Sequence, residues 1–453
     1  MQNPFARIFR KAEPMQTRRF DGAAGGRRGF GMGTFGRINP EIAAAGQSLR
    51  SRAAYLSMNN PWIAQGVANW TGALVGPGLQ PTSKHPDPEM RRAINAYFET
   101  WAERADAEGL TDFWGQQAAI AHSMVVAGEG LALLIDSDDG PQIRILPPEL
   151  LDESKTVELS EGRTIFAGVE LDQNGRRVAF HILPERPAST FASYAPAQRV
   201  DADSVLHVFR PNAPGQVRGV SWLAQVILTA SDTDGYEDAL LMAAKVAAMH
   251  SGFIVDVNGA TTDPHGGGDT ASMEPGALIR LGVGEDIKFN SPQQLQQADA
   301  FLRHNLRKIA AGMGLPDHLV SGDLSGANYS SLRAGLLPFR QRVEQVQYGV
   351  LVPRFLAPVW RAVITHGILS GGIDAPDFEQ NPRDFLSADW LAPKPLQVDP
   401  AKDLAATRAE LELGLTSRRK AVAERGWVLE DLDAEIQADA LGKTLSEQKD
   451  SKE

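Results

Sequence analysis

The chain has 453 residues, a formal net charge of −11 and no cysteine. Its length exceeds the size at which one hydrophobic core usually divides, so we expect two or three domains. The lack of cysteine excludes disulfides and thiolate metal sites and favours folding in a reducing, intracellular compartment. The negative charge argues against a protein whose whole surface grips nucleic acid.

The hydropathy pattern contains no segment with the roughly 18 consecutive apolar residues that span a bilayer. The first residues also lack the apolar run of a secretory signal, so we expect no export by that route. Residues 124–135 are the most apolar stretch, but Glu129 interrupts them. We therefore expect a buried element there and no contact with a membrane.

Residues 1–37 differ in charge from the rest of the chain. They hold eight Lys/Arg and two acids, an excess of six positive charges, and they are rich in glycine. This composition predicts a mobile arm. Two interpretations remain open, a disordered solubilising tail and a basic arm that binds a polyanion or a protein partner.

Residues 48–136 show the apolar spacing of helices. Breaks are predicted at Asn59-Asn60-Pro61 and at Gly76-Pro77-Gly78, and a new helix should begin near Pro88. Between 131 and 210 the pattern changes to short runs with β-branched residues, which predict strands of a mixed sheet. These runs are LALLI, PQIRILP, TIFAGVEL, RVAFHIL and SVLHVFR.

Helical spacing returns at 221–250, where the chain also carries an acidic cluster made of Asp232, Asp234, Glu237 and Asp238. A glycine-rich excursion follows, which predicts two or three strands around a loose tip. The next helix is expected at 298–314. Its apolar residues share one face because they recur at helical spacing, and its basic residues share another.

The basic stripe of this helix consists of Arg303, His304, Arg307 and Lys308. Its simplest interpretation is a solvated face. Two alternatives are contact with nucleic acid and contact with the acidic cluster of the 221–250 helix in a neighbouring subunit.

Residues 332–367 predict a long helical stretch. Pro338, Pro353 and Pro358 each remove an internal hydrogen bond, so we expect kinks or breaks there. Two shorter helices are expected at 400–414 and 417–426, and the polar residues 442–453 should fray.

The sequence contains several partial matches to catalytic motifs, but each lacks a required residue or structural context. Gly442-Lys443-Thr444 lacks the first glycine of a phosphate-binding loop, since position 437 is Gln437. Ser417 begins an S-x-x-K pattern but is more simply a helix cap. The sequence DPHGGGD at 263–269 is too glycine-rich for a preorganised metal site, so we expect no metal and no cofactor.

The loop LVSGDLSGANYSSLRAGL at 319–336 poses the sharpest question about catalysis. Ser325 sits in a G-x-x-S-G arrangement after a helix, whereas a nucleophile elbow needs G-x-S-x-G after a strand. Ser330 and Ser331 are better placed to cap a helix starting near Leu332. A serine hydrolase using Ser325 is kept as a remote alternative.

Four blocks together resemble the portal proteins of tailed bacteriophages, lambda-type family. The resemblance extends from about residue 45 to 435, and the third block is the most specific. The blocks are NNPWIAQGVANWTGALVGPGLQP (59–81), RGVSWLAQVI (218–227), LVSGDLSGANYSSLRAGLLPFRQRVE (319–344) and AATRAELELGLTSRRKAVAERGW (405–427).

The resemblance implies an α+β, mainly helical portal fold that assembles as a ring, with twelve copies in the capsid, at one capsid vertex. Double-stranded DNA would pass through the central channel during packaging and ejection. The implied protein partners are further copies of the chain, the terminase large subunit, the major capsid and scaffold proteins, and head-completion adaptor proteins. The implied protein is not an enzyme; another phage connector or structural ring protein is the alternative.

The family's domains can be transferred by their order along the chain. The implied units are a basic N-terminal arm (1–39), a wing (40–215), stem helix 1 (216–252), a clip (253–292), stem helix 2 (293–315), a tunnel loop (316–331), a kinked helix that returns to the wing (332–398), crown helices (399–440) and a disordered tail (441–453).

The resemblance also implies which residues contact DNA. The tunnel-loop residues expected to approach it are Gly322, Asp323, Ser325, Gly326, Asn328 and Tyr329. The basic stripe would lie on the channel wall or at the subunit interface, and the clip would bind terminase and head-completion proteins.

Overall fold

The computed structural model describes residues 36–137, 140–184, 195–249, 253–254, 279–280, 293–326, 328–392, 400–423, 425, 429 and 432–439. Most of the expected arm, the 263–269 turn, most of the expected clip and the 442–453 tail lie outside these residues. The last residues of the expected arm, Ile38 and Asn39, already belong to the first helix. Within the described part of the chain, no helix is long and apolar enough to cross a membrane.

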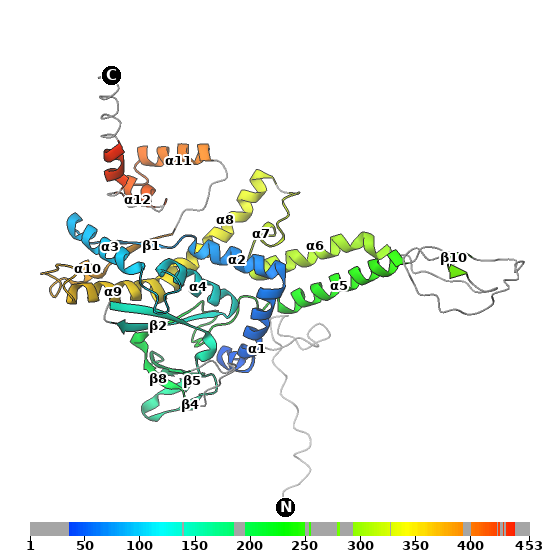
Figure 1. Ribbon diagram of the computed structural model, residues 1–453, viewed down its shortest axis with the longest axis horizontal. Coiled ribbons are helices and arrows are strands. Elements are labelled where there is room, and N and C mark those ends of the chain that lie inside the picture. The colour runs from blue at the N-terminus through cyan, green and yellow to red at the C-terminus, as the bar shows by residue number, and fades with distance from the viewer. Residues whose placement is uncertain are drawn as a thin grey trace, which may run out of the picture.

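Four helices form the first part of the body (Figure 1): α1 (Ile38–Asn59), α2 (Pro61–Val75), α3 (Pro88–Ala102) and α4 (Phe113–Val126). The predicted breaks are confirmed by their caps. The side chain of Asn60 accepts a hydrogen bond from the Ile63 N–H at 2.9 Å, and Pro61 follows at the first helical position. Asp87 and Asp112 cap α3 and α4 in the same way.

The strands of the region 129–209 form two antiparallel sheets, so the expectation of one mixed sheet there is wrong. One sheet has the order β3-β2-β9, and the other has the order β4-β5-β6-β7-β8. Their bounds are β2 (Glu129–Ser137), β3 (Gly140–Leu146), β4 (Val157–Glu158), β5 (Thr164–Phe166), β6 (Val169–Leu171), β7 (Arg177–Ile182), β8 (Gln198–Asp201) and β9 (Val205–Phe209).

Short connections explain the antiparallel pairing. Parallel neighbours need a crossover of a dozen residues or more, whereas β5 and β6 are joined by Ala167 and Gly168 alone. Both residues have positive φ, 46° and 84°, as a tight hairpin requires. Three short 3₁₀ turns lie between strands, at Pro148–Leu150, Ser160–Gly162 and Ala202–Ser204.

Helices α5 (Ile227–Met249) and α6 (Gln293–Met313) form a hairpin that projects from the body (Figure 1). Compared with the prediction, α5 begins six residues later, after turns at 221–226, and α6 begins five residues earlier. The parallel strands β10 (Phe253–Ile254) and β11 (Ile279–Arg280) are the described part of its far end.

The base of this hairpin is packed closely against α2. The indole N–H of Trp70 donates to the carbonyl of Met313 at 2.9 Å. A Cβ on Gly66 would lie 2.5 Å from the Met313 Cε, so glycine is what allows the two helices to approach. The position of α6 relative to the body is therefore set by buried contacts.

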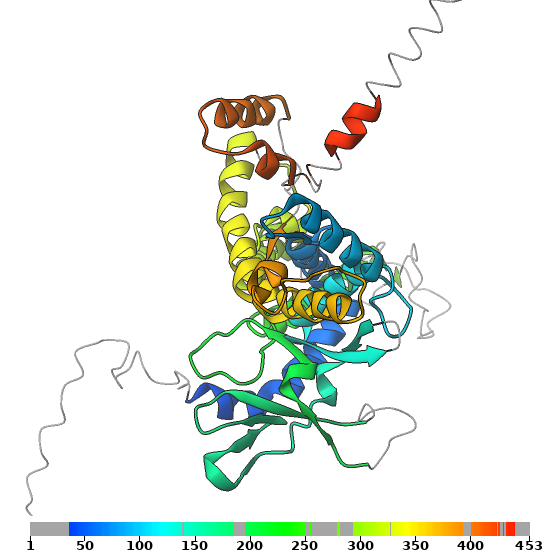
Figure 2. The same cartoon turned by 90° about the vertical axis from the view of Figure 1, so that its left-hand side faces the viewer.

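The short helix α7 (His318–Ser321) and a loop lead into the predicted long helical stretch. It consists of α8 (Tyr329–Val346), a π-helical segment (Gln347–Leu356) and α9 (Ala357–Leu369). The π segment contains Pro353, and a wider turn accommodates the missing N–H. The path turns between α8 and α9 (Figure 2), near Pro353 as expected, whereas α8 continues through Pro338 without a break.

The chain then passes through α10 (Pro382–Leu386) to β12 (Ala388–Leu391), which pairs with β1 (Gln80–Ser83). Helices α11 (Pro400–Glu412) and α12 (Arg418–Ala423) follow, and residues 432–439 are also helical. The hydroxyl of Ser417 accepts from the Lys420 N–H at 3.1 Å, so the S-x-x-K serine is a helix cap.

Two hydrophobic cores hold the body together. The larger one joins the helices to β2, β3 and β9 and contains Trp70, Phe98, Phe355 and Trp360. The smaller one contains residues of both sheets, among them Leu131 of β2 and Phe180 of β7. Figure 2 shows the five-stranded sheet at the lower end of the body, at the level of the beginning of α1, with α8 at the opposite end.

Candidate DNA-contacting loop

The loop between α7 and α8 lies at the base of the hairpin (Figure 1). Gly322 ends α7 in the left-handed conformation, with φ 67°. Asp323 then forms a turn in which its side chain accepts from the Ser325 N–H at 2.9 Å. Residues 322–326 and Asn328 are exposed, so the predicted loop residues that the structure describes do reach the surface.

The end of this loop differs from the prediction. Helix α8 begins at Tyr329, so Ser330 and Ser331 lie in its first turn and do not precede it. The carbonyl of Asn328 accepts from the Leu332 N–H at 3.0 Å, as the residue before a helix does. The observed cap differs from the predicted one because the helix begins three residues earlier than the apolar spacing indicates. The Tyr329 side chain lies outside the description.

The four basic side chains of the stripe on α6 are all exposed. Two of them form ion pairs with acids of the α7 region. Arg303 lies 3.4 Å from Asp323 and 3.0 Å from Asp299, and Arg307 lies 3.5 Å from Asp317. The structure therefore brings together part of the stripe and the loop, which the sequence presented as separate features.

Hydrogen bonds from Ser325, and then the charges of Arg303 and Arg307, hold the pKa of Asp323 below its usual range. Asp323 is therefore ionised at neutral pH and partly neutralises the arginines beside it. Solvent-exposed pairs of this kind hold a loop only loosely, because water and salt screen them. The Arg303–Asp323 ion pair, which we call the tether, is therefore a weak link between the loop and α6.

A cavity of about 520 Å³ lies between α6, the loop and α8. Arg303, Arg307 and Arg342 contribute to its wall together with Asp317 and Asp323. Arg342 donates to the carbonyl of Gly314 at 2.6 Å. In the described residues, no histidine hydrogen-bonds Ser325; its N–H and hydroxyl both serve the Asp323 turn.

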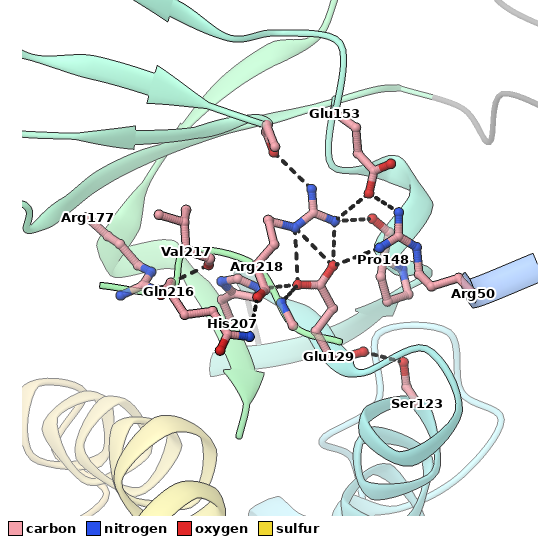
Figure 3. A network of polar contacts seen from close by, with 12 residues as sticks. Arg50, Ser123, Glu129, Pro148, Glu153, Arg177, His207, Gln216, Val217 and Arg218 are labelled. Carbon is pink, nitrogen blue, oxygen red and sulfur yellow. Dashed lines mark hydrogen bonds and ion pairs between the residues drawn. The ribbon is translucent and has the colours of Figure 1, made fainter. Parts of the chain in front are cut away.

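A second polar site, which the sequence did not reveal as such, lies in the body around Glu129 (Figure 3). Arg218 donates to both carboxylate oxygens, from Nε at 3.0 and 3.1 Å, and Gly219 N–H donates at 2.8 Å. His207 Nε2 lies 2.9 Å from Oε2. Arg50, whose guanidinium is 3.8 Å away, also forms an ion pair with Glu153.

This Glu129 network connects distant parts of the chain. Arg218 also donates to the carbonyls of Ala167 at 2.9 Å and Pro148 at 3.3 Å, so it ties both sheets together. The signal that could have revealed the network was Glu129 itself. A carboxylate within an apolar stretch needs a cation nearby, because burying an unpaired charge is costly.

The electrostatics agree with a structural role. Burial favours neutral Glu129, but the charge of Arg218 and the hydrogen bond with His207 outweigh it and hold the pKa of Glu129 well below its usual range. Burial lowers the pKa of His207. Among the described residues its Nδ1 has no hydrogen-bond partner, which fits a neutral ring that donates from Nε2 to Glu129.

Within the described residues, no group of three or more His, Asp or Glu side chains could hold a metal ion. The 263–269 sequence lies outside them.

Comparison with known proteins identifies the family. The model of the family "Phage portal protein, lambda family" matches residues 32–347. A "Probable portal protein" of Halomonas phage phiHAP-1 is 26% identical over 467 residues, covering 96% of this chain and 89% of the relative. "Portal protein B" of Escherichia phage lambda is 22% identical over 322 residues, covering 63% of this chain and 59% of the relative.

Among solved structures, the neck of a native gene transfer agent particle computed with C12 symmetry is similar, with a TM-score of 0.44 and 15% identity. That similarity covers 84% of this chain and 93% of the other. The family match spans more than half of the chain and includes the hairpin, the loop and Arg218. The chain belongs to the lambda family of phage portal proteins.

Proposed function

We propose that this portal protein forms a ring of identical subunits at one capsid vertex, through which double-stranded DNA enters during packaging and leaves during ejection. The match of the lambda portal family to residues 32–347 carries this proposal. A structural role is consistent with the chemistry described above, and we propose that the chain catalyses no reaction.

The arrangement of elements supports a domain assignment. We propose that α5 and α6 are the stem and that the 253–292 excursion between them is the clip, which binds terminase and head-completion proteins. The sheets and α1–α4 are the wing, to which β12 returns by pairing with β1. Helices α11 and α12 belong to the crown, and the basic arm before residue 40 contacts capsid, scaffold or DNA.

The loop between α7 and α8 is the part of the chain that we propose touches DNA. Its described residues include one acid and no base, and small side chains predominate. Arg303 and Arg307 beside it are partly neutralised by Asp323 and Asp317. Tight binding to phosphates needs uncompensated cations, so a surface of this kind contacts DNA without retaining it.

Electron microscopy of the purified full-length chain tests the ring. We expect perforated, rotationally symmetric rings; a protein that remains monomeric at micromolar concentration in low salt would overturn the proposal. The ring test does not depend on the loop, so it can be read separately from the DNA contact.

Deletion of residues 322–329 tests the loop. Rings should still form, because the loop contributes little to either core, while packaged DNA length or its retention should fall. A matched control deletes an exposed turn elsewhere, Asp172–Gly175, which joins β6 to β7. Normal packaging by a ring-forming loop deletion would remove the loop from the DNA path.

A further inference from the structure

The α5–α6 hairpin presents two outward faces of opposite charge. On α5, Asp232 and Asp238 are exposed, and on α6, His304 and Lys308 are exposed. Within the part of the chain that the structure describes, none of these four side chains forms an ion pair or a hydrogen bond. Among the described residues, these acids and bases of the hairpin therefore have no counterpart of opposite charge in their own subunit.

The basic stripe on α6 is divided by its surroundings. Arg303 and Arg307 are paired with acids near the loop. His304 and Lys308 lie one turn apart, on the side of the helix that these acids do not reach. Phe301, beside them in the helical pattern, is half exposed although its ring contacts Tyr236 of α5.

The exposed face of α5 has the composition of a helix-packing surface. Leu228 and Met242 are 70% and 60% exposed. Between them, Gly235 and Ala239 continue the same face at helical spacing and are also exposed. A Cβ on Gly235 would meet no atom within 4 Å, so space for another helix is open there. Large apolar ends around small residues permit close approach of a second helix.

The acids on α5 repel one another in the single subunit. Burial, and then the charges of Asp234 and Asp238, raise the pKa of Glu237 despite its hydrogen bond with Trp62. A cation placed opposite this face would relieve the repulsion. Asp232 and Asp238 are separated by six residues, about 9 Å along the helix, and His304 and Lys308 by four, about 6 Å. Six residues also turn about 120° around the helix, so Asp232 and Asp238 flank the face that contains Gly235 and Ala239.

We propose that the α5 face of one subunit packs against the His304–Lys308 face of α6 in the next subunit, with Asp232 and Asp238 opposite the bases and Leu228 and Met242 covered. The partner is a second copy of this chain. Because the two faces differ, the contact is head-to-tail, and repeating it generates a ring when the rotation closes. This inference rests on the proposed ring and assigns its stem contact.

Charge reversal and mixing test the inference in the full-length chain. The acid-face variant carries Asp232→Lys and Asp238→Lys, and the base-face variant carries His304→Glu and Lys308→Glu. Each variant alone places like charges in every stem contact, so we expect its ring fraction, measured by analytical ultracentrifugation, to fall more than about tenfold.

An equimolar mixture of the two variants should restore rings. The lysines on α5 of an acid-face subunit then meet the glutamates on α6 of a base-face subunit, and the native faces of the two variants meet each other. One chain carrying all four substitutions should also restore rings. Matched controls reverse two exposed acids outside the hairpin, Asp374→Lys with Glu379→Lys, or two exposed bases, Arg92→Glu with Arg104→Glu; their rings should persist.

The outcomes separate this inference from the proposed function. Rings that persist in both single-face variants overturn the stem contact but leave the ring intact. Loss of rings in each variant without recovery in the mixture also overturns it, since the charges would then not face each other. A wild-type chain that forms no rings overturns the proposed ring and the contact together.

Discussion

Two regions of this portal protein use the same chemical pair, arginine and carboxylate, for opposite purposes. In the body, Arg218 and Glu129 are each about 1% exposed and lie within a network that reaches both sheets. At the base of the hairpin, Arg303 and Asp323 are 51% and 40% exposed and 3.4 Å apart. Because the first pair is buried, it stabilises the fold; because the second is exposed to solvent, it holds the loop only weakly.

The role of an ion pair therefore depends on the burial of its two side chains and not on their charges alone. Removing one partner of a buried pair leaves the other charge without solvation, whereas an exposed partner simply returns to water. Substitutions at the two sites should therefore differ in kind: those in the body affect folding, and those at the loop affect its motion.

Arg218→Ala should have the largest effect. It leaves the buried Glu129 with hydrogen bonds from His207 and the Gly219 N–H but with only the more distant Arg50 as a cation among the described residues, so we expect a loss of about 3–5 kcal/mol in the free energy of unfolding. Denaturant unfolding followed by tryptophan fluorescence measures it. Arg303→Ala is the matched control and should leave the unfolding midpoint almost unchanged. Equal midpoints for the two variants would contradict the structural role of the network.

Lowering the pH should reduce the free energy of unfolding of the body, through His207 first and then through Glu129. The folded-state pKa of His207 lies below its unfolded value, about 6.5, and that of Glu129 lies below its unfolded value, about 4.3. In both cases the unfolded chain binds protons first, so stability is full above these values and falls as pH decreases through them.

Thermal unfolding between pH 7 and 4 measures this dependence. His207→Gln should flatten the part that begins near pH 6.5, since the amide does not titrate, while leaving the steeper loss that Glu129 causes at lower pH. A wild-type midpoint that does not change between pH 7 and 5 would show that His207 contributes nothing to it.

Asp323→Asn should have the smallest effect on stability. The amide keeps the turn with Ser325 but weakens the attraction to Arg303, so the loop should open more often without loss of folding. Cleavage of the 322–328 segment by a protease should become faster at low salt, and the difference from wild type should vanish at high salt, where such pairs are screened. Unchanged cleavage at low salt would argue against the tether.

Much of the secondary structure could be predicted because its signals are local. Asn60-Pro61 and Pro88 marked helix starts, β-branched runs marked strands, and the tunnel-loop region was placed between helices. Errors arose where the signal was weak: α8 begins at Tyr329, since serines that can cap a helix are also tolerated in its first turn. The antiparallel direction of the strands could not be predicted, because it depends on which strands lie side by side in the folded chain.

The amino-acid sequence by itself determined the family, through four blocks in the right order, and the alternation of helices and strands, through apolar spacing and caps. The tertiary structure alone decided which charges meet. Glu129, His207 and Arg218 are separated by up to 89 positions and converge because two sheets and α1 pack around them. Arg303 and Asp323 meet because α7 turns back along α6. Local patterns specify elements, but the pairing of distant charges follows from the packing of those elements.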